Sequence, residues 1–404
     1  MSFASVSGRR AGSVARLARF ALHAAPALAV VVAGAYAVAC GDLISATDGV
    51  DGGADADTTT RPTEEDAGSV PIVPIADASD GAVVVDCAAE DAGFGAPNDL
   101  ACTGLYSDFA TRTIAAANKA FDPGLHLWSD GAEKARWIYL PPGQKIDTTD
   151  MNEWRMPVGT RAWKEFKISG HRVETRMFWK RGTNDWVRAT YRWSDDETQA
   201  TSLEVGDTNV GGTTYAIPTI QQCDTCHAGR IDHLLGFEAV SLSQPTATGM
   251  TVQVLAAQNL LTTNPTSSLA IPNDSTGKAA GALGWMHANC GTACHNGSPG
   301  SFAGATALWL RLDVQADGTL GALKDTSTWK TAVGVTPDLE PFRGRGWKRI
   351  TPNDPFVGDG LSLLPYRDGK RNETGIQMPP IATSIPDLAN DAMVRDWIKN
   401  GNFQ

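Results

Sequence analysis

After residue 100 this sequence lacks an excess of charge of either sign. Residues 101–404 contain 31 acidic and 29 basic residues, so most of the net charge of −11 lies in the segment before them. A nucleic-acid-binding domain requires a clustered basic face, and we therefore expect no nucleic-acid partner. Long apolar runs are also lacking. The run from Ala27 to Ala39 is shorter than the about 20 apolar residues that a membrane-spanning helix needs.

The first 39 residues lack acidic side chains and contain four arginines ahead of that apolar run. A basic start, a short apolar stretch and small residues before a cleavage point are typical of a secretory signal peptide, which we predict for residues 1–39. The residues from Ala37 to Gly41 resemble a bacterial lipobox, so we expect Cys40 to carry a lipid that anchors the protein to the outer membrane. The alternative is an ordinary A-x-A cleavage site in front of Cys40. Either signal exports the protein to the periplasm or the cell surface.

Residues 40–100 are poor in hydrophobic and basic side chains. They hold fourteen acidic residues and one basic residue, Arg61. Such a composition does not bury enough apolar surface to offset the entropy lost on ordering, which predicts a disordered acidic linker. Cys87 and Cys102 are expected to form a disulfide near its end, because exported compartments are oxidising. A loop of this size contributes about 3 kcal/mol. Two free thiols are the alternative.

Residues 101–220 hold most of the tryptophans, with seven of the twelve between residues 105 and 219. Apolar and polar side chains alternate in residues 173–180 and 187–193, and a short loop with Gly182 joins the two runs. This pattern predicts a β-hairpin. Further short alternating runs with turns predict an antiparallel β-sandwich-like domain. Its aromatic residues are expected in the core or in cross-strand pairs; a carbohydrate-binding face is the alternative.

The four remaining cysteines form two similar motifs. Residues 223–227 read C-x-x-C-H, with Cys223, Cys226 and His227, and residues 290–295 read C-x-x-x-C-H. The first pattern is that of covalent attachment of c-type haem, in which two thiols bind the porphyrin and the adjacent histidine binds the iron. The sequence therefore predicts two haem c groups. One is attached through Cys223 and Cys226 with His227 as proximal ligand. The other is attached through Cys290 and Cys294 with His295.

Two other uses of these cysteines remain as alternatives. Two close pairs could bind zinc, but a histidine follows both pairs directly, which favours haem. A thioredoxin-type redox site needs a βαβ context, and the sequence has no sign of one.

Residues 221–404 are predicted to consist of helices and loops. Ala279–Ala288 has a composition compatible with a helix and leads directly to Cys290, and Asp387 can cap a closing helix that ends near Asn400. A helix before the haem motif and an aromatic-bearing helix at the end are the layout of small c-type cytochromes. We therefore expect an all-α cytochrome c-like domain.

Met378 is the expected distal ligand of the haem at His295. Pro379 and Pro380 follow it and stiffen the loop before the closing helix. His/Met ligation raises the reduction potential relative to His/His and leaves no open position on the iron, which is typical of an electron carrier. An ordinary buried methionine is the alternative.

The distal ligand of the haem at His227 stays open at the level of sequence. Without one, the iron would be five-coordinate and open to peroxide or another small molecule. The candidates are His126, His233, Met250, Met286 and His287.

The chain resembles a family of exported, largely uncharacterised bacterial proteins that join a Trp-rich β-domain to a C-terminal cytochrome c domain. The resemblance covers about residues 120–404. It implies haem attachment at both cysteine pairs, proximal ligation by His227 and His295 and distal ligation by Met378. The second motif departs from the family pattern by one extra residue, so a single thioether through Cys294 is an alternative to double attachment. The segments that carry the resemblance are Leu127–Gly131, Arg172–Arg176, Gln222–His227, His287–His295 and Gln377–Pro380.

The function predicted from sequence is that of an exported, lipid-anchored, di-haem c-type cytochrome that transfers electrons to or from a redox partner protein. One alternative is a haem enzyme of the peroxidase or dehydrogenase-subunit type with an open first haem. The other is a surface binding protein in which the β-domain binds the ligand and the haem is structural.

The anchor can be tested directly. Cys40→Ser is expected to move the protein from the membrane fraction to the soluble fraction or to block processing, because a diacylglyceryl group on that sulfur is the strong anchor that the sequence offers. Fractionation followed by immunoblotting measures this. A variant that is processed normally and stays equally membrane-bound would show that Cys40 carries no lipid.

Overall fold

The computed structural model describes residues 86–87, 95–355, 362–371, 373 and 375–404. Cys40, the predicted signal peptide and most of the predicted linker lie outside these ranges. All described residues belong to one compact unit that spans residues 76–404. No helix within the described ranges is both long and apolar enough to cross a membrane.

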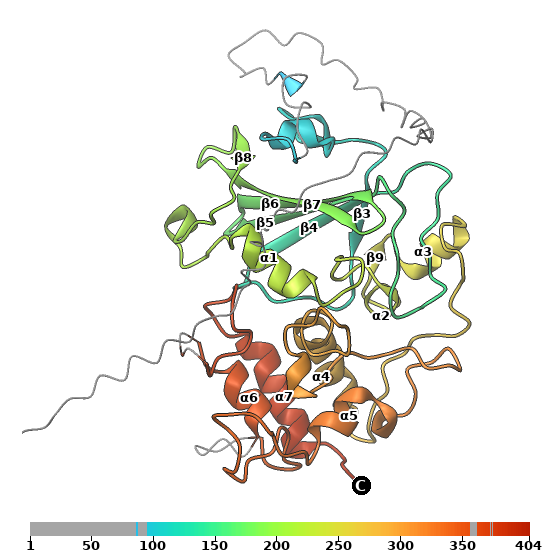
Figure 1. Cartoon of the computed structure of the whole chain (residues 1–404), viewed down its shortest axis with the longest axis vertical. Coiled ribbons are helices and arrows are strands. Elements are labelled where there is room, and N and C mark those ends of the chain that lie inside the picture. Colours follow the sequence, from blue (N-terminus) through green and yellow to red (C-terminus); the bar gives the residue numbers. More distant parts are fainter. Residues whose placement is uncertain (1–85, 88–94, 356–361, 372, 374) are drawn as a thin grey trace, which may run out of the picture. The chain divides into compact units, whose positions relative to one another are not determined.

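Strands dominate the first half of the unit and short helices the second (Figure 1). The strands are β1 Tyr106–Asp108, β2 Thr113–Ile114, β3 Lys119–Asp122, β4 Glu133–Tyr139, β5 Arg161–Ile168, β6 His171–Gly182, β7 Asp185–Trp193, β8 Ala200–Ser202 and β9 Thr248–Gly249. The α-helices are α1 Ile220–His227, α2 Ala239–Leu242, α3 Val252–Ala257, α4 Ala279–Met286, α5 Ser327–Ala332, α6 Leu363–Asp368 and α7 Leu388–Asn400.

Seven strands form one antiparallel sheet in the order β8-β7-β6-β5-β4-β3-β9. The predicted hairpin is confirmed, since β6 pairs with β7 and Met177 lies opposite Ala189. The second sheet contains only β1 and β2. The prediction of an antiparallel architecture is therefore confirmed, whereas the described strands do not form two facing sheets of a sandwich.

Both faces of the large sheet are covered, which explains why no second sheet is needed. On one face, Trp163, Met177 and Tyr191 are buried together with Leu100 and Leu105 from the segment before β1. The Tyr106 hydroxyl donates to Glu165 at 3.2 Å on the same face. Figure 1 shows this segment on one side of the sheet and the helices on the other. In the central strands, the side chains that alternate with the hydrophobic ones are therefore covered by protein as well.

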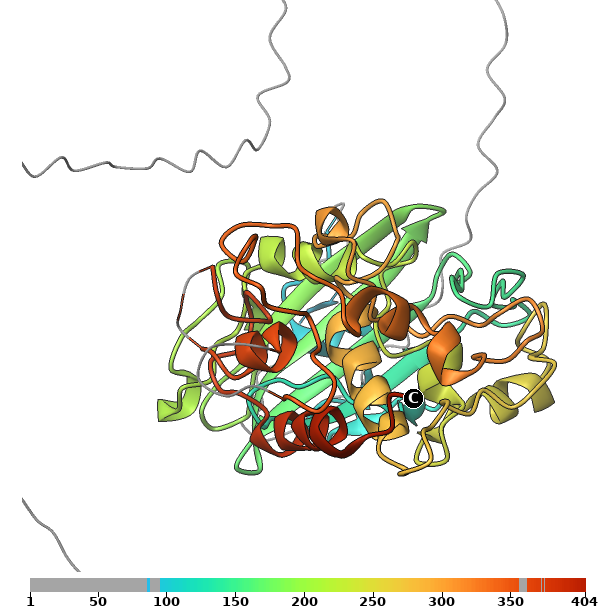
Figure 2. The ribbon, with the colours of Figure 1, turned by 90° about the horizontal axis from the view of Figure 1, so that it is seen from below.

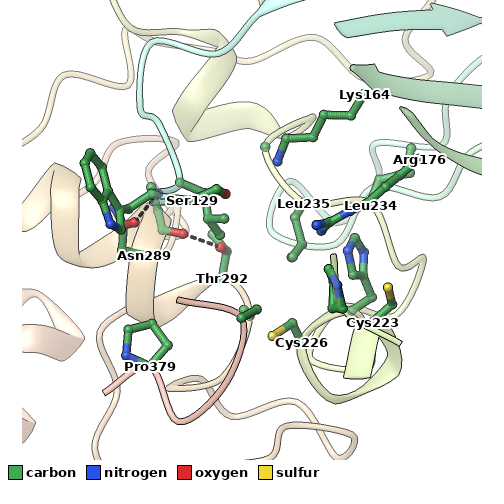
Figure 3. A pocket seen from close by; sticks show the side chains of 18 of the residues that line it. Ser129, Lys164, Arg176, Cys223, Cys226, Leu234, Leu235, Asn289, Thr292 and Pro379 are labelled. Atoms are coloured by element: carbon green, nitrogen blue, oxygen red, sulfur yellow. Dashed lines mark hydrogen bonds between the residues drawn. The ribbon is translucent and has the colours of Figure 1, made fainter. Parts of the chain in front are cut away.

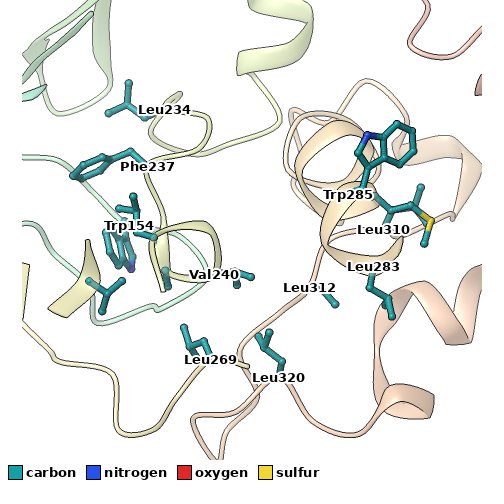
Figure 4. Close-up of a cluster of buried hydrophobic side chains, with 14 of the residues drawn as sticks. Trp154, Leu234, Phe237, Val240, Leu269, Leu283, Trp285, Leu310, Leu312 and Leu320 are labelled. Atoms are coloured by element: carbon teal, nitrogen blue, oxygen red, sulfur yellow. The ribbon is translucent and has the colours of Figure 1, made fainter. Parts of the chain in front are cut away.

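The other face packs against residues 221–404. Phe178 and Ile138 from the sheet share a hydrophobic core with Phe237, Trp285 and Trp397. Figure 2 shows helices of the second half in front of the strands, and Figure 4 shows the part of this core around Trp154, Phe237 and Leu283. The boundary expected at residue 220 consequently does not separate two compact bodies.

The expected all-α character of residues 221–404 is not found. Strand β9 pairs with β3, and parallel bridges join Val333 to Ile350 and Lys348 to Ser362. Gly249 has φ of +71°, and a Cβ atom there would lie 2.1 Å from the Ala120 carbonyl oxygen. Only glycine allows this close approach, so this residue returns the chain to the sheet edge.

The two helices expected around the second motif are confirmed as α4 and α7. Asp387 caps α7 by accepting from the backbone N–H of Asn390, and its carboxylate also accepts from the Trp285 indole at 3.1 Å. A Cβ atom at Gly281 of α4 would lie 2.9 Å from the Met393 sulfur of α7. The helices therefore pack closely, at a position where α4 has no side chain.

The sulfur atoms of Cys87 and Cys102 are 2.10 Å apart, so the structure pairs these cysteines as expected. The tryptophans of the sheet region are mostly interior. Trp154, Trp163, Trp186 and Trp193 are buried. This favours the core interpretation of the aromatic residues over a carbohydrate-binding face.

A buried ion pair joins the sheet to the second half of the chain and provides a test of the single unit. Lys180 Nζ of β6 lies 2.6 Å from Asp232 Oδ1, and both side chains are almost fully buried. Asp232→Ala leaves Lys180 buried without its partner, which is expected to lower the free energy of unfolding by about 3–5 kcal/mol. Urea unfolding measures this.

The matched control is Asp195→Ala. Asp195 pairs with Arg192 at 3.5 Å on the surface and is 87% exposed. Its removal is expected to cost less than about 1 kcal/mol. Equal effects of the two substitutions would contradict the account of the interface between sheet and helices.

Candidate functional site

One large cavity lies between the sheet and the helical half of the chain, and the C-x-x-C-H motif opens into it (Figure 3). It contains about 1580 Å³ of empty space, which includes open solvent at its mouth. Three of the four motif thiols line it, together with residues of β3, β4, β5 and β6. Cys290 and His295 are not among its lining residues.

Helix α1 holds the first motif. Thr219 and Gln222 form a capping box at its start, in which the Thr219 hydroxyl accepts from the Gln222 N–H and the Gln222 side chain accepts from the Thr219 N–H. The helix then presents Cys223 and Cys226 to the cavity and ends at His227. Arg188 of β7 fixes the helix to the sheet through an ion pair with Asp224 at 2.9 Å.

His227 is held in an orientation that leaves one ring nitrogen available. Its Nδ1 lies 2.5 Å from the His233 carbonyl oxygen, so this nitrogen carries the proton and donates. Within the described ranges its Nε2 has no hydrogen-bond partner, and the ring stacks on Phe178 at 4.3 Å. Burial lowers the pKa of His227 to about 3. The ring is therefore neutral at pH 7, with a lone pair on Nε2, as iron ligation requires.

The second motif begins in a π-helical turn. Helix α4 continues into His287–Gly291, in which the Thr292 N–H donates to the His287 carbonyl five residues back at 2.9 Å. The His295 N–H likewise donates to the Cys290 carbonyl at 2.7 Å. One extra residue in a helix is accommodated by such a widened turn, which is frequent at functional sites. The turn absorbs the additional residue between Cys290 and Cys294.

His295 repeats the arrangement of His227. Its Nδ1 lies 3.3 Å from the Leu308 carbonyl oxygen, and Nε2 has no partner among the residues that the structure describes. Burial lowers the pKa of His295 to about 4, and nearby Arg367 and Arg349 act in the same direction. Both motif histidines are thus neutral, oriented by a backbone carbonyl and unpaired at Nε2.

The two motifs touch each other. The thiols of Cys226 and Cys294 lie close enough for their interaction to lower the pKa of Cys226 and raise that of Cys294. A Cβ atom at Gly229 would lie 1.7 Å from the Ala293 carbonyl oxygen. A Cβ atom at Gly300 would lie 2.3 Å from the Ala228 carbonyl oxygen. The backbone after the first motif therefore lies in direct contact with the second motif and with the residues that follow it, and only glycine permits that.

The loop that bears Met378 lies beside the second motif. Helix α6 holds it, because the Met378 N–H donates to the Arg367 carbonyl at 3.0 Å and Arg371 Nη1 donates to the Met378 carbonyl at 2.8 Å. Arg367 is close enough to His295 to lower its pKa, and Arg371 acts on the pKa of Cys290. Pro379 lines the cavity. The Met378 backbone is thus bonded to two arginines whose charges act on the second motif, and its role as a ligand stays a prediction.

The other candidate ligands have different environments. His287 Nδ1 accepts from the Leu312 N–H and its Nε2 bonds to Glu238 at 3.3 Å, so both ring nitrogens are used. Met250 and Met286 are buried in the hydrophobic core. His126 is exposed and pairs with Asp122. His233 contributes its carbonyl oxygen to His227. None of these five side chains lines the cavity, where His227 is the only described histidine and no described methionine is present.

The zinc alternative finds no support in the arrangement of the four thiols. Across the described ranges, no group of three or more His, Cys, Asp or Glu side chains is placed to hold a metal ion. Burial raises the pKa of Cys223 and of Cys290, so these two thiols are protonated at pH 7.

Two sets of residues at the site were missed by reading the sequence. Arg136, Lys164 and Arg176 line the sheet wall of the cavity, and no role was predicted for them from the sequence. In the second set, Asp130 accepts from the Ser384 and Ile385 N–H groups. The Trp128 N–H donates to Asn289 at 2.6 Å. These contacts tie the Leu127–Gly131 loop to the second motif and to the chain after Met378.

The residues present fit a covalently bound haem. The first motif offers two thiols and an unpaired imidazole Nε2 on one cavity, and basic side chains on the facing wall suit the propionate groups. The second motif offers an imidazole whose Nδ1 also lies at a backbone carbonyl. Comparison with known proteins gives no match: no family model fits the sequence, and no curated protein or solved structure is significantly similar to it.

The contact between the motifs can be tested at Gly229. Its φ lies in the region open to any residue, so Gly229→Ala acts through the overlap with Ala293 alone. Forcing these backbones apart is expected to lower the free energy of unfolding by about 1–3 kcal/mol. Urea unfolding measures the change.

Gly297→Ala serves as the control, because a Cβ atom there has no neighbour within 4 Å. It is expected to change stability by less than about 0.5 kcal/mol. If Gly229→Ala proved as harmless as Gly297→Ala, the close approach of the two motifs would be wrong.

Proposed function

We propose that this protein is an exported di-haem c-type cytochrome that transfers electrons. The observation that carries the proposal is the matched state of His227 and His295. Each is buried and neutral, each has its Nδ1 at a backbone carbonyl, and each lacks a partner at Nε2 among the described residues. A histidine that binds metal is normally oriented in this way by its other nitrogen.

The chain's own residues would hold the two groups as follows. Cys223 and Cys226 supply thiols for the first and His227 its proximal ligand, while Cys290, Cys294 and His295 do the same for the second. The π-helical turn supports double attachment at the second motif, because it takes up the extra residue. When bound, haem iron supplies one-electron chemistry by alternating between ferrous and ferric states.

Met378 closes the second site in this proposal. The hydrogen bonds of its backbone to Arg367 and Arg371 hold the loop against the motif. A thioether ligand favours ferrous iron and raises the reduction potential. The mutual effect of Cys226 and Cys294 on their pKa values supports two neighbouring attachment points, an arrangement that would suit electron transfer between the groups.

A second candidate function is supported by the lining of the cavity. The described lining residues include no methionine and no histidine other than His227, so they offer no ordinary sixth ligand to the first iron. An open position of this kind suits a haem enzyme that binds a small molecule such as peroxide.

Substitution of Met378 tests the proposal and separates the two candidates. In protein matured in an export-competent host, the oxidised spectrum is expected to show the weak Met-to-iron charge-transfer band near the red end. Met378→Ala should abolish this band and lower the potential of that haem only. Redox titration followed by absorption spectroscopy measures both effects. Met393→Ala is the control, because Met393 packs between α4 and α7.

Carbon monoxide added to the reduced wild-type protein then reports on the first site. A spectrum that does not respond indicates two closed sites and a carrier, whereas a shifted Soret band indicates the open site of an enzyme. The absence of any Soret band in matured protein would refute both candidates.

A further inference from the structure

A row of three basic side chains crosses the central strands where they face the cavity. In the register of the sheet, Arg136 of β4 lies directly opposite Lys164 of β5, and Lys164 lies directly opposite Arg176 of β6. All three line the cavity that holds the first motif. Figure 3 shows Lys164 and Arg176 extending from the sheet toward the cavity, on which Cys226 also opens.

Two members of the row have their own carboxylates. Arg136 pairs with Asp122. Arg176 binds Glu174 through two hydrogen bonds of 2.8 and 2.6 Å, and Glu174 also accepts from the Tyr215 hydroxyl. These two charges are therefore compensated within the protein.

Lys164 is different, because no described residue pairs with its ammonium group. Its one close contact of note is a cation–π interaction with the Phe166 ring at 5.0 Å. Lys134 is a further cation close to Lys164. Its ammonium group donates to the Leu127 carbonyl, which carries no charge. When Lys164 is protonated, the wall therefore presents more positive than negative charge to the cavity.

The repulsion between these positive charges indicates which kind of ligand the cavity binds. Like charges directly opposite each other in a sheet are destabilising, and Lys164 is partly buried between two arginines of the neighbouring strands. Burial, the Arg136 charge and the Lys134 charge together lower the pKa of Lys164 well below its usual value. A carboxylate in the cavity would offset the repulsion, accept a hydrogen bond from the ammonium group and add an acceptor for the neighbouring guanidinium groups.

We infer that Lys164, supported by Arg136 and Arg176, forms a carboxylate-binding subsite on the sheet wall of the cavity. The carboxylate has two sources that share this chemistry: a propionate of the haem attached at Cys223 and Cys226, or a free small carboxylate. The first source rests on the proposed function and the second does not. In both cases the β-sheet forms one wall of the site, and the group that it binds is a carboxylate.

The test compares Lys164→Gln with Lys167→Gln in the full-length, export-matured protein. Lys167 is on the same strand but on the opposite face, where it pairs with Glu165 at 3.6 Å, so it controls for loss of a lysine from β5. Lys164→Arg keeps the charge and is expected to behave as the wild type. Each protein is examined by redox titration and by calorimetric titration with succinate.

If a propionate occupies the subsite, Lys164→Gln lowers the midpoint potential of the first haem, since a nearby positive charge that favours electron uptake is lost. Lys167→Gln leaves that potential unchanged, and succinate does not bind. If a free carboxylate is the ligand, succinate binds the wild type and binds Lys164→Gln at least about tenfold more weakly, as expected for loss of a charged hydrogen bond.

The inference is overturned if Lys164→Gln matches Lys167→Gln in potential and succinate either does not bind or binds both variants equally. Should the matured protein carry no haem, the proposed function fails. The succinate titration then decides the subsite alone, and lack of Lys164-dependent binding overturns it.

Discussion

The contact of the two motif backbones constrains the rest of the structure. Gly229 and Gly300 let the residues after α1 and after the second motif approach within a distance that no side chain allows. This holds the first motif beside the second, while Arg188 of β7 pairs with Asp224 of α1. The sheet must then bury the face that looks toward the motifs, and its other face is covered by residues 95–118. One compact unit follows from that contact.

Several charged side chains of the sheet are buried in this unit. They lie on the sheet face that packs against the second half of the chain and lines the cavity. Glu174 and Lys180 are nearly inaccessible on β6, yet Arg176 and Asp232 satisfy them. Buried charges are tolerated when they are paired and hydrogen-bonded. Lys164 is only partly buried and has no carboxylate partner among the described residues, and its position on the cavity wall links the sheet to the chemistry of the site.

Features that depend on neighbouring residues were predicted correctly, whereas features that depend on contacts between distant residues were not. The hairpin of β6 and β7 and the cap of α7 at Asp387 depend on neighbouring residues, so the sequence alone was sufficient. The cysteine motifs and Met378 were recognised from spacing and from a resemblance. The single sheet was missed because alternation does not tell a solvated face from a face that lines a cavity. The clamp of Asp130 on Ser384 joins residues 254 positions apart, and no pattern reports such a contact.

The central claim is that both motifs hold covalent haem on one compact scaffold. The pyridine haemochrome spectrum, combined with the protein concentration of export-matured chain, measures the haem content per chain. The account predicts two haems of the c type that survive acid–acetone extraction. Matured protein that contains zinc and no haem would contradict it.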